Sequence, residues 1–303
     1  MQSQTHQKTI FNKPALTIEK QLILLKQRGL IIEDDELAKH YLTYIGYYRL
    51  SGYMKPFQNA DNSFIENFNF DKILNYYYFD KNLRNLLLKN IKQIEIALKS
   101  ILINEIAGEN KIIHFTNTTI FDSKNKTSKG EFLSDVAKRI IEDVSINCPE
   151  DKRNLCIQHY YDNYSAPEIP PTWMVIESLS MGSLSLLYKC LEKPIRKSVA
   201  EYFGLSPSIF ANWIHCLTMI RNVCAHHSRL WNRDFSILPI LSDVIIEFKN
   251  NKQNINKKKL YPQILIIDYL IKQIGLEISF MKDLDNLITT HNININKMGA
   301  YKN

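Results

Sequence analysis

Hydrophobic residues recur at spacings of three and four along most of the chain, and no long alternation of period two appears. This pattern is typical of amphipathic helices with one buried face, so we expect an all-α protein, a helical bundle with additional N-terminal and C-terminal helices. The strongest helix is predicted over about residues 71–107, where an apolar stripe runs from Leu83 through Ile91 to Leu102. Charged side chains flank this stripe, as expected for a helix packed against a core.

Capping and helix-breaking residues predict the neighbouring helices. Thr17 is placed to cap a first helix that Gly29 ends, and a second helix runs from about Asp34 to Tyr44 and stops near Gly46. Two shorter helices are expected within residues 131–164, and two more close the chain after a Lys/Asn-rich loop at 250–259.

Prolines mark the starts of three further helices, because proline is favoured in the first turn. One begins at Pro171 and is expected to run to about Leu191, and the next begins at Pro194. Ser206 and Pro207 are expected to cap a helix that continues through the most distinctive polar segment of the chain.

A chain of 303 residues can bury a full core. We expect an N-terminal helical region over 1–65, a helical core over 66–245 with an inserted segment at about 109–165, and C-terminal helices over 246–303. The longest apolar runs fall short of the roughly 18–20 residues of a membrane helix, and residues 1–8 lack the apolar segment of a secretion signal. We therefore expect a cytoplasmic protein with no membrane partner.

The cysteines and carboxylates give no sign of a metal site or cofactor. The five cysteines are widely spaced and include no Cys-x-x-Cys pair, which argues against a zinc site and against a disulfide framework. Glycine-rich phosphate loops, His-Glu-x-x-His motifs and nucleophile elbows are also missing from the sequence. We therefore expect no metal and no cofactor.

Residues 221–233, Arg-Asn-Val-Cys-Ala-His-His-Ser-Arg-Leu-Trp-Asn-Arg, carry the candidate chemistry. Arg221 is a permanent cation, and His226 exchanges a proton near neutral pH. Metal-free RNA cleavage needs these two properties, a charge that holds the phosphate and a base that takes the 2′-hydroxyl proton. Arg221, Asn222 and His226 are therefore candidate catalytic residues, with the adjacent His227 as a weaker candidate.

The geometry of this motif depends on how far its helix continues. Successive helical residues turn by about 100°, so a continuous helix would place four polar side chains on one face. These are Asn222, His226, Arg229 and Arg233. Arg221 would lie about 140° from His226, close enough for its long side chain to curl around the helix. Alternatively, these polar groups cap a helix end and make buried hydrogen bonds, with Trp231 in the core.

A net charge of +7 and a pI near 8.9 are compatible with phosphate binding without establishing it. Arg229, Trp231 and Arg233 are candidate RNA-binding residues beside the catalytic ones. A second candidate is the aromatic and basic run at 44–57, which includes Tyr48, Arg49 and Tyr53 and could stack on unpaired bases. Tyrosines at helical spacing fit a core equally well. Glu95 could orient a catalytic arginine or histidine, or form a simple salt bridge.

Several segments occur in the order seen in one known family. They are Gly-Tyr-Tyr-Arg-Leu-Ser-Gly-Tyr at 46–53, Tyr-Phe-Asp-Lys-Asn-Leu-Arg at 78–84, Ile-Glu-Ile-Ala-Leu at 94–98, Pro-Thr-Trp-Met-Val-Ile-Glu at 171–177, Met-Gly-Ser at 181–183, and the motif at 221–233. Over about residues 15–240 the chain resembles the Abi-like abortive-infection proteins of bacteria, the AbiD/AbiF group, whose core is a HEPN-type helical domain.

The resemblance implies RNA cleavage in antiphage defence or in toxin-like growth arrest. Arg221 would hold and polarise the phosphate, Asn222 would position it, and His226 would transfer the proton. His227 also satisfies the spacing of the HEPN motif, so the choice between the two imidazoles stays open. The resemblance further implies an active site assembled from two copies, hence a homodimer or higher oligomer, and a structured non-coding RNA that restrains or assists the protein.

Three functions remain open at this point. The first is a metal-independent endoribonuclease. The second is a non-catalytic RNA-binding or sensor protein of a defence or toxin–antitoxin system, which would bind RNA in a salt-dependent way and leave no cleavage products. The third is a helical module that binds another protein.

Overall fold

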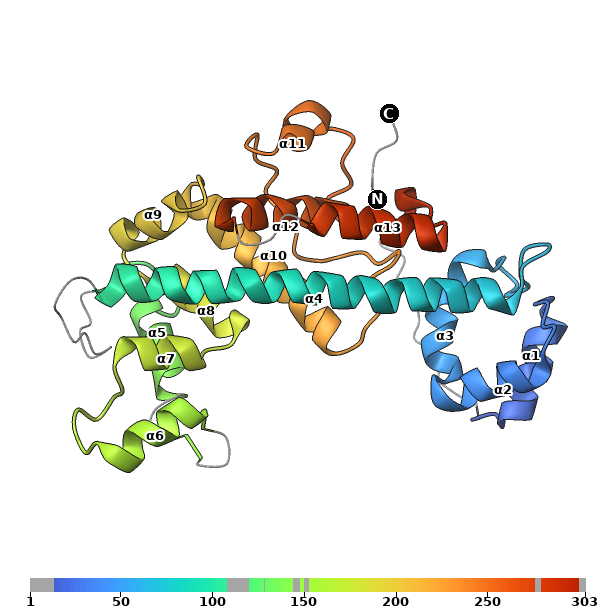
Figure 1. Ribbon diagram of the computed structural model, residues 1–303, viewed down its shortest axis with the longest axis horizontal. Coiled ribbons are helices and arrows are strands. Elements are labelled where there is room, and N and C mark those ends of the chain that lie inside the picture. The colour runs from blue at the N-terminus through green and yellow to red at the C-terminus, as the bar shows by residue number, and fades with distance from the viewer. Residues whose placement is uncertain are drawn as a thin grey trace. The chain divides into compact units, whose positions relative to one another are not determined.

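The computed structural model describes residues 14–107, 120–127, 129–143, 148–149, 153–275 and 279–299 (Figure 1). Within these ranges the chain forms thirteen α-helices and short 3-10 helices, and its β pairing is limited to isolated bridges between single residues. The expectation of an all-α protein is confirmed. Across the same ranges, no helix is both long enough and apolar enough to cross a membrane.

The chain divides into two compact units, the first ending at Phe79 and the second beginning at Asp80. This boundary falls inside α4 (Phe70–Ala107), the long helix that the apolar stripe predicts. The expected divisions at 65 and 245 stay predictions. Of the expected inserted segment, residues 109–119, 128, 144–147 and 150–152 lie outside the described residues.

The first unit is built from short helices whose ends match their capping residues. They are α1 (Ile18–Gln27), α2 (Asp35–Tyr44), α3 (Tyr47–Met54), the 3-10 helix η1 (Lys55–Phe57) and the start of α4. Thr17 Oγ1 accepts a hydrogen bond from the Lys20 amide at 3.4 Å, and Asp34 Oδ1 accepts one from the Leu37 amide at 2.9 Å. Both side chains act as N-caps, and the expected starts of the two helices, at Thr17 and at about Asp34, are confirmed.

Aromatic side chains pack between α2, α3 and α4 in the first unit. The hydroxyl groups of Tyr41 and Tyr78 are 2.7 Å apart and share a hydrogen bond. The Tyr53 ring meets the Tyr77 ring edge to face, with 5.8 Å between their centroids, and Tyr53 is only 2% exposed. Tyr53 of the aromatic run at 44–57 is therefore core, whereas Tyr44 and Tyr48 of the same run are exposed.

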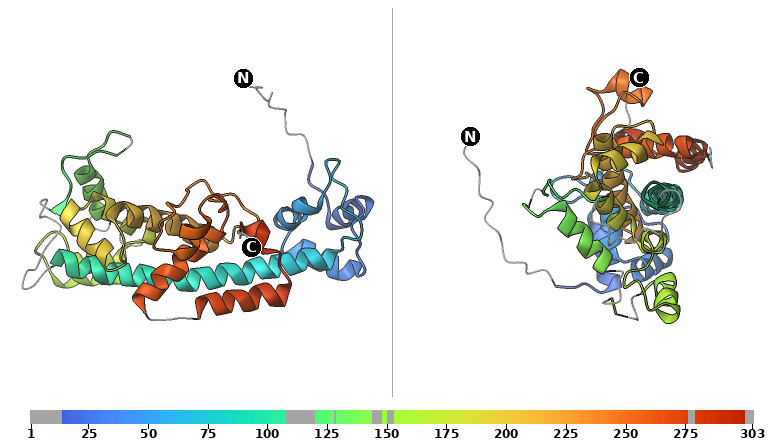
Figure 2. Two further views of the ribbon diagram at one scale, coloured as in Figure 1. Left: turned by 90° about the horizontal axis from the view of Figure 1, so that it is seen from above. Right: turned by 90° about the vertical axis from the view of Figure 1, so that its left-hand side faces the viewer.

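The second unit contains the rest of α4 and the remaining helices. They are α5 (Leu133–Glu142), α6 (Leu155–Asn163), α7 (Thr172–Ser178), α8 (Met181–Cys190), α9 (Lys193–Glu201), α10 (Pro207–Ala225), α11 (Ile246–Asn251), α12 (Tyr261–Ile274), α13 (Phe280–His291) and the 3-10 helix η4 (Ile295–Met298). Helices α8, α9 and α12 pack against α10 (Figures 1 and 2). Helix α10 is thus central to this unit.

The prediction of one continuous helix from Pro171 to about Leu191 is wrong. The chain breaks after Ser178, because Leu179 and Ser180 adopt extended backbone angles. Ser180 then acts as a new N-cap, and its Oγ accepts a hydrogen bond from the Ser183 amide at 3.2 Å. A serine can compete with the helical backbone in this way, which the apolar spacing alone does not reveal.

Helix α10 separates an apolar face from a polar one. Its buried side chains are Phe210, Trp213, Ile214, Cys216, Leu217, Ile220 and Cys224. The indole Nε1–H of Trp213 donates to the Ile240 carbonyl at 2.8 Å, which fixes the segment after the motif against the helix. The opposite face carries His215 and Asn222, which are at least partly exposed.

Candidate active site

Helix α10 ends at Ala225, inside the motif. The His227 amide donates to the Cys224 carbonyl and the Ser228 amide to the Val223 carbonyl, each at 3.0 Å. His227 has a φ of 53°, in the left-handed region. This is the Schellman arrangement of a helix C-terminus, in which the position held here by His227 usually carries glycine.

The expected common face of four polar side chains is therefore wrong. It required the helix to continue to Arg233, whereas Arg229 and Arg233 lie in the non-helical segment that follows. Of the expected group, Asn222 remains on α10 and His226 is its C-cap residue. The alternative in which the motif caps a helix end describes this backbone better.

A buried carboxylate on α4 holds the segment that follows the helix end. Asp80 is fully buried, and its oxygens accept hydrogen bonds from the Leu230 amide at 3.1 and 3.2 Å and from the Trp231 amide at 2.7 Å. The same carboxylate is paired with Arg84, one turn later on α4 and 5% exposed. Asp80 therefore fixes the backbone of the non-helical segment at Leu230 and Trp231. The segments 78–84 and 221–233 thus meet in space.

The polar face of α10 and the segment after it line an open cleft of about 430 Å³. Its lining residues are His215, Thr218, Met219, Asn222, Val223, His226, Ser228, Arg233 and Ile237. Three of the predicted site residues, Asn222, His226 and Arg233, therefore meet at one cleft. The first two are exposed and Arg233 is half-buried, so the cleft presents an amide, an imidazole and a guanidinium to a ligand.

Arg221 reaches the edge of this cleft through its neighbour. Its Nη1 lies 3.5 Å from Asn222 Oδ1, so the side chain bends toward the amide that lines the cleft. Arg221 itself is half-buried and is not a lining residue. His227 is exposed, and it is also not among the lining residues. Of the two adjacent imidazoles, His226 lines the cleft and His227 does not.

Two of the expected RNA-binding rings are not accessible. Trp231 is 1% exposed and Tyr53 is 2% exposed, so neither ring has a free face on which a base could stack. The expectation that Trp231 and Tyr53 bind RNA is therefore wrong, because both side chains are buried in the core. Tyr48 and Arg49, on α3 of the first unit, are exposed, and Tyr48 is 92% accessible.

Arg229 has a structural place in the loop rather than in the cleft. Its Nη1 donates to the Trp231 carbonyl at 2.6 Å and to the Asn232 carbonyl at 3.1 Å, which holds the turn after the motif. Glu95, half-buried on α4, makes no ion pair with an arginine or histidine of the motif in the part of the chain that the structure describes. The orienting role expected for Glu95 has no contact to support it.

The sequence interpretation did not select His215, which lines the cleft, or Lys189, which contacts His215. His215 lies on the same face of α10 as Asn222, which follows it by seven positions. The Nδ1 atom of His215 lies 3.3 Å from Lys189 Nζ. Burial lowers the pKa of His215, and the neighbouring ammonium lowers it further. The spacing of seven from Asn222 was the available signal, because it returns to one helix face after two turns.

The Lys/Asn-rich loop is attached to the end of the motif. Lys259 Nζ lies 3.1 Å from Asn232 Oδ1 and 2.9 Å from Asp234 Oδ1, and the Phe235 amide donates to the Lys258 carbonyl at 2.7 Å. Lys258 and its neighbour Lys257 are exposed. Two exposed ammonium groups therefore lie on a loop that is hydrogen-bonded to the segment carrying Arg233.

The cysteines of α8 and α10 are free and buried. Burial raises the pKa of the Cys190 thiol to about 11 and that of the Cys216 and Cys224 thiols to about 12. These thiols are therefore neutral near pH 7, and a neutral thiol is a poor nucleophile and metal ligand. Cys224, although inside the motif, is a packing residue.

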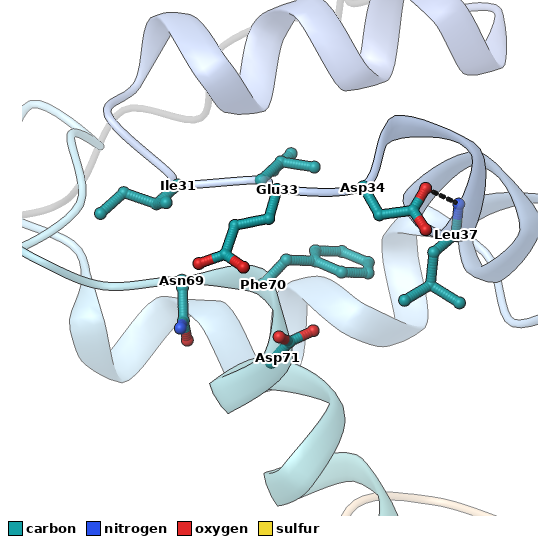
Figure 3. Close-up of a pocket in the computed structure, with 8 residues that line it drawn as sticks. Ile31, Glu33, Asp34, Leu37, Asn69, Phe70 and Asp71 are labelled. Atoms are coloured by element: carbon teal, nitrogen blue, oxygen red, sulfur yellow. Dashed lines mark hydrogen bonds between the residues drawn. The ribbon is translucent and has the colours of Figure 1, made fainter.

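A second, smaller pocket of about 100 Å³ lies in the first unit and is lined partly by acidic residues (Figure 3). Its carboxylates belong to Glu33, Asp34 and Asp71. Asp34 is engaged as the N-cap of α2, through its hydrogen bond to the Leu37 amide. Within the described residues, no group of three or more histidine, cysteine or acidic side chains is arranged to hold a metal ion.

Comparison with known families gives one match. The family model described as Abi-like protein matches residues 40–232, more than half of the chain, and this range includes both the Asp80–Arg84 pair and most of the motif. No curated protein and no solved structure matches the chain.

The Asp80 carboxylate is predicted to be a major source of stability in the second unit. Asp80→Ala removes the carboxylate that pairs with the buried Arg84 guanidinium and accepts from two backbone amides, which should cost about 3–5 kcal/mol in urea unfolding. Arg84→Met should cost less, because the carboxylate keeps its hydrogen bonds to the Leu230 and Trp231 amides. As a matched control, Glu201→Ala breaks an exposed pair with Lys197 at the same spacing and should cost under about 0.5 kcal/mol. Equal losses for Asp80 and Glu201 would contradict this account.

The left-handed backbone of His227 makes a second prediction. His227→Gly should leave the free energy of unfolding within about 1 kcal/mol of the parent, because glycine adopts this conformation without steric cost. His227→Val should lower it by about 1–2 kcal/mol, since a branched side chain is disfavoured there. Urea titration of the three proteins provides the test, and a Val variant as stable as the Gly variant would contradict the assignment.

Proposed function

The chain belongs to the Abi-like protein family, and from this premise we propose that it is a metal-independent endoribonuclease of abortive-infection defence. Within the family we propose the AbiD/AbiF group, with a HEPN-type domain as the catalytic part. The substrate is RNA, and the site is the cleft at the end of α10.

The observation that carries the proposal is the exposed imidazole of His226 at an open cleft, beside an amide and two guanidiniums. Asn222 and Arg233 line the same cleft, and Arg221 approaches it through Asn222 Oδ1. An imidazole can exchange a proton near neutral pH, while guanidiniums bind phosphate oxygens. These groups supply the two requirements for RNA cleavage without a metal.

In the proposed reaction, His226 takes the proton of the ribose 2′-hydroxyl, and the 2′-oxygen attacks the adjacent phosphorus. The bond from phosphorus to the 5′-oxygen breaks, which leaves a 2′,3′-cyclic phosphate on one product and a 5′-hydroxyl on the other. Arg221 and Arg233 stabilise the charge that develops on the non-bridging oxygens, and the Asn222 amide positions the phosphate. The leaving 5′-oxygen takes its proton from a second acid.

A homodimer would supply that second acid. One copy of the motif is present in the sequence, so a composite site with two histidines needs a second chain. We further propose that a structured non-coding RNA restrains or assists the protein. Lys257 and Lys258, exposed on the loop that Lys259 ties to Asn232, are placed to contact phosphates outside the cleft.

The alternative is a non-catalytic RNA-binding or sensor protein of a defence or toxin–antitoxin system. The same exposed cations favour it, because they would bind a phosphate backbone whether or not His226 acts on it. In that case Arg233→Ala should weaken RNA binding and reduce its salt dependence, His226→Ala should not, and no cleaved ends should form.

Cleavage of a labelled single-stranded RNA in excess EDTA tests the proposal. The parent protein should cut it to products with cyclic phosphate ends, whereas His226→Ala and Arg221→Ala should each reduce the rate by about 100-fold or more. His227→Gly is the matched control, since it removes the neighbouring imidazole at a position suited to glycine, and it should retain most of the activity. Loss of cleavage with EDTA, or an active His226→Ala protein, would overturn the mechanism.

A further inference from the structure

Lys189 and His215 form a polar pair beside the cleft, away from the motif. Lys189 belongs to α8 and His215 to α10, and Lys189 Nζ lies 3.3 Å from His215 Nδ1. His215 lines the cleft that Asn222 and His226 also line, and both members of the pair are half-buried. The catalytic steps proposed above use neither side chain.

The chemistry of the two side chains determines which of their nitrogen atoms can donate a hydrogen bond to a ligand. An ammonium group has donors and no acceptor, so Lys189 donates and His215 Nδ1 accepts. The proton of the neutral imidazole is therefore on Nε2, which makes the remaining ring nitrogen a hydrogen-bond donor. The pair thus combines a positive charge with a polarised N–H group, and both features favour an anion.

No carboxylate offsets the charge of Lys189 in the part of the chain that the structure describes, where it forms no ion pair. Burial lowers the pKa of Lys189, and burial together with Lys189 lowers the pKa of His215. The other titratable neighbours that act on Lys189 are the thiols of Cys190 and Cys216, which carry no charge near pH 7. A half-buried cation without a counterion is costly for the protein alone and is relieved by a bound anion.

The pair lies too far from His226 to act on the same phosphate. His215 precedes His226 by eleven positions along α10, which corresponds to about 16 Å at 1.5 Å per residue. A single-stranded RNA lying along the polar face of α10 would reach from one end of the cleft to the other over several nucleotides. The pair is therefore separated from the reacting atoms by more than one phosphate.

We propose that Lys189 and His215 form a subsite that binds a non-scissile phosphate of the RNA held in the cleft. The subsite rests on the proposed function in that its occupant is RNA. It makes the cleft prefer substrates that extend beyond the cleaved bond, and its contribution falls on binding rather than on the chemical step.

The test compares Lys189→Met with the parent protein on two substrates, an oligouridylate with many phosphates and a dinucleoside monophosphate with one. The variant should raise KM for the long substrate by about tenfold, because a charge-assisted hydrogen bond is lost, and leave kcat unchanged. For the dinucleoside monophosphate, kcat/KM should not change. Lys189→Arg should restore the parent KM for the long substrate, since it keeps the charge.

Direct binding separates this subsite from the nuclease proposal. Fluorescence anisotropy with a labelled oligouridylate on the His226→Ala background should show weaker binding when Lys189→Met is added, and a salt slope reduced by about 0.7. Lys197→Met, on the exposed face of α9, is the matched control and should leave the affinity and the salt slope unchanged. If the parent cuts no RNA but Lys189→Met still weakens binding, the nuclease proposal fails and the subsite stands.

The subsite is overturned if Lys189→Met leaves the affinity and the salt slope unchanged, or if it impairs both substrates equally. A thermal unfolding measurement on Lys189→Met shows whether a change in binding or in kinetics comes from misfolding. Lys189→Met should unfold at the same temperature as the parent or higher, because a thioether is easier to bury than an ammonium. If Lys189→Met unfolds earlier, His215→Gln replaces it in the same binding measurement, and unchanged binding there overturns the subsite.

Discussion

The buried carboxylate of Asp80 fixes the course of the chain after α10, and the candidate site depends on it. Its oxygens hold the Leu230 and Trp231 amides, while Arg84 balances its charge. A charge is expensive to bury unless it is paired and hydrogen-bonded, and here both conditions are met. The consequence is a defined exit from the helix, which turns the polar end of the motif toward the cleft while Trp231 enters the core.

The helix end itself distinguishes two adjacent histidines with the same side chain. His226 is the last residue associated with α10 and lines the cleft, whereas His227 takes the left-handed position that follows. The two side chains point to different surroundings because the backbone changes from the helical to the left-handed conformation at His227. Both Arg229 and Arg233 donate to carbonyls of the loop, and Arg233 in addition lines the cleft.

The cleft gains its character from the polar face of a helix whose other face is fully packed. Helices α8, α9 and α12 pack against α10, and the cleft lies along the side that carries His215, Asn222 and His226. Arg233 lines the cleft, and Lys189 contacts the lining residue His215. Several cations at or beside one open cleft suit a polyanion, which is the physical basis of the RNA proposals.

The sequence by itself determined the all-α fold, because apolar spacing and local caps such as Thr17, Asp34 and Ser206 depend on neighbours within a few residues. It also identified the motif that carries Asn222 and His226. Tertiary structure alone decided the path of the chain after α10, since the carboxylate that holds the Leu230 amide lies 150 positions earlier in the chain. It likewise decided that Trp231 and Tyr53 are buried and that Lys189 meets His215. These outcomes depend on contacts between distant segments, which local periodicity does not encode.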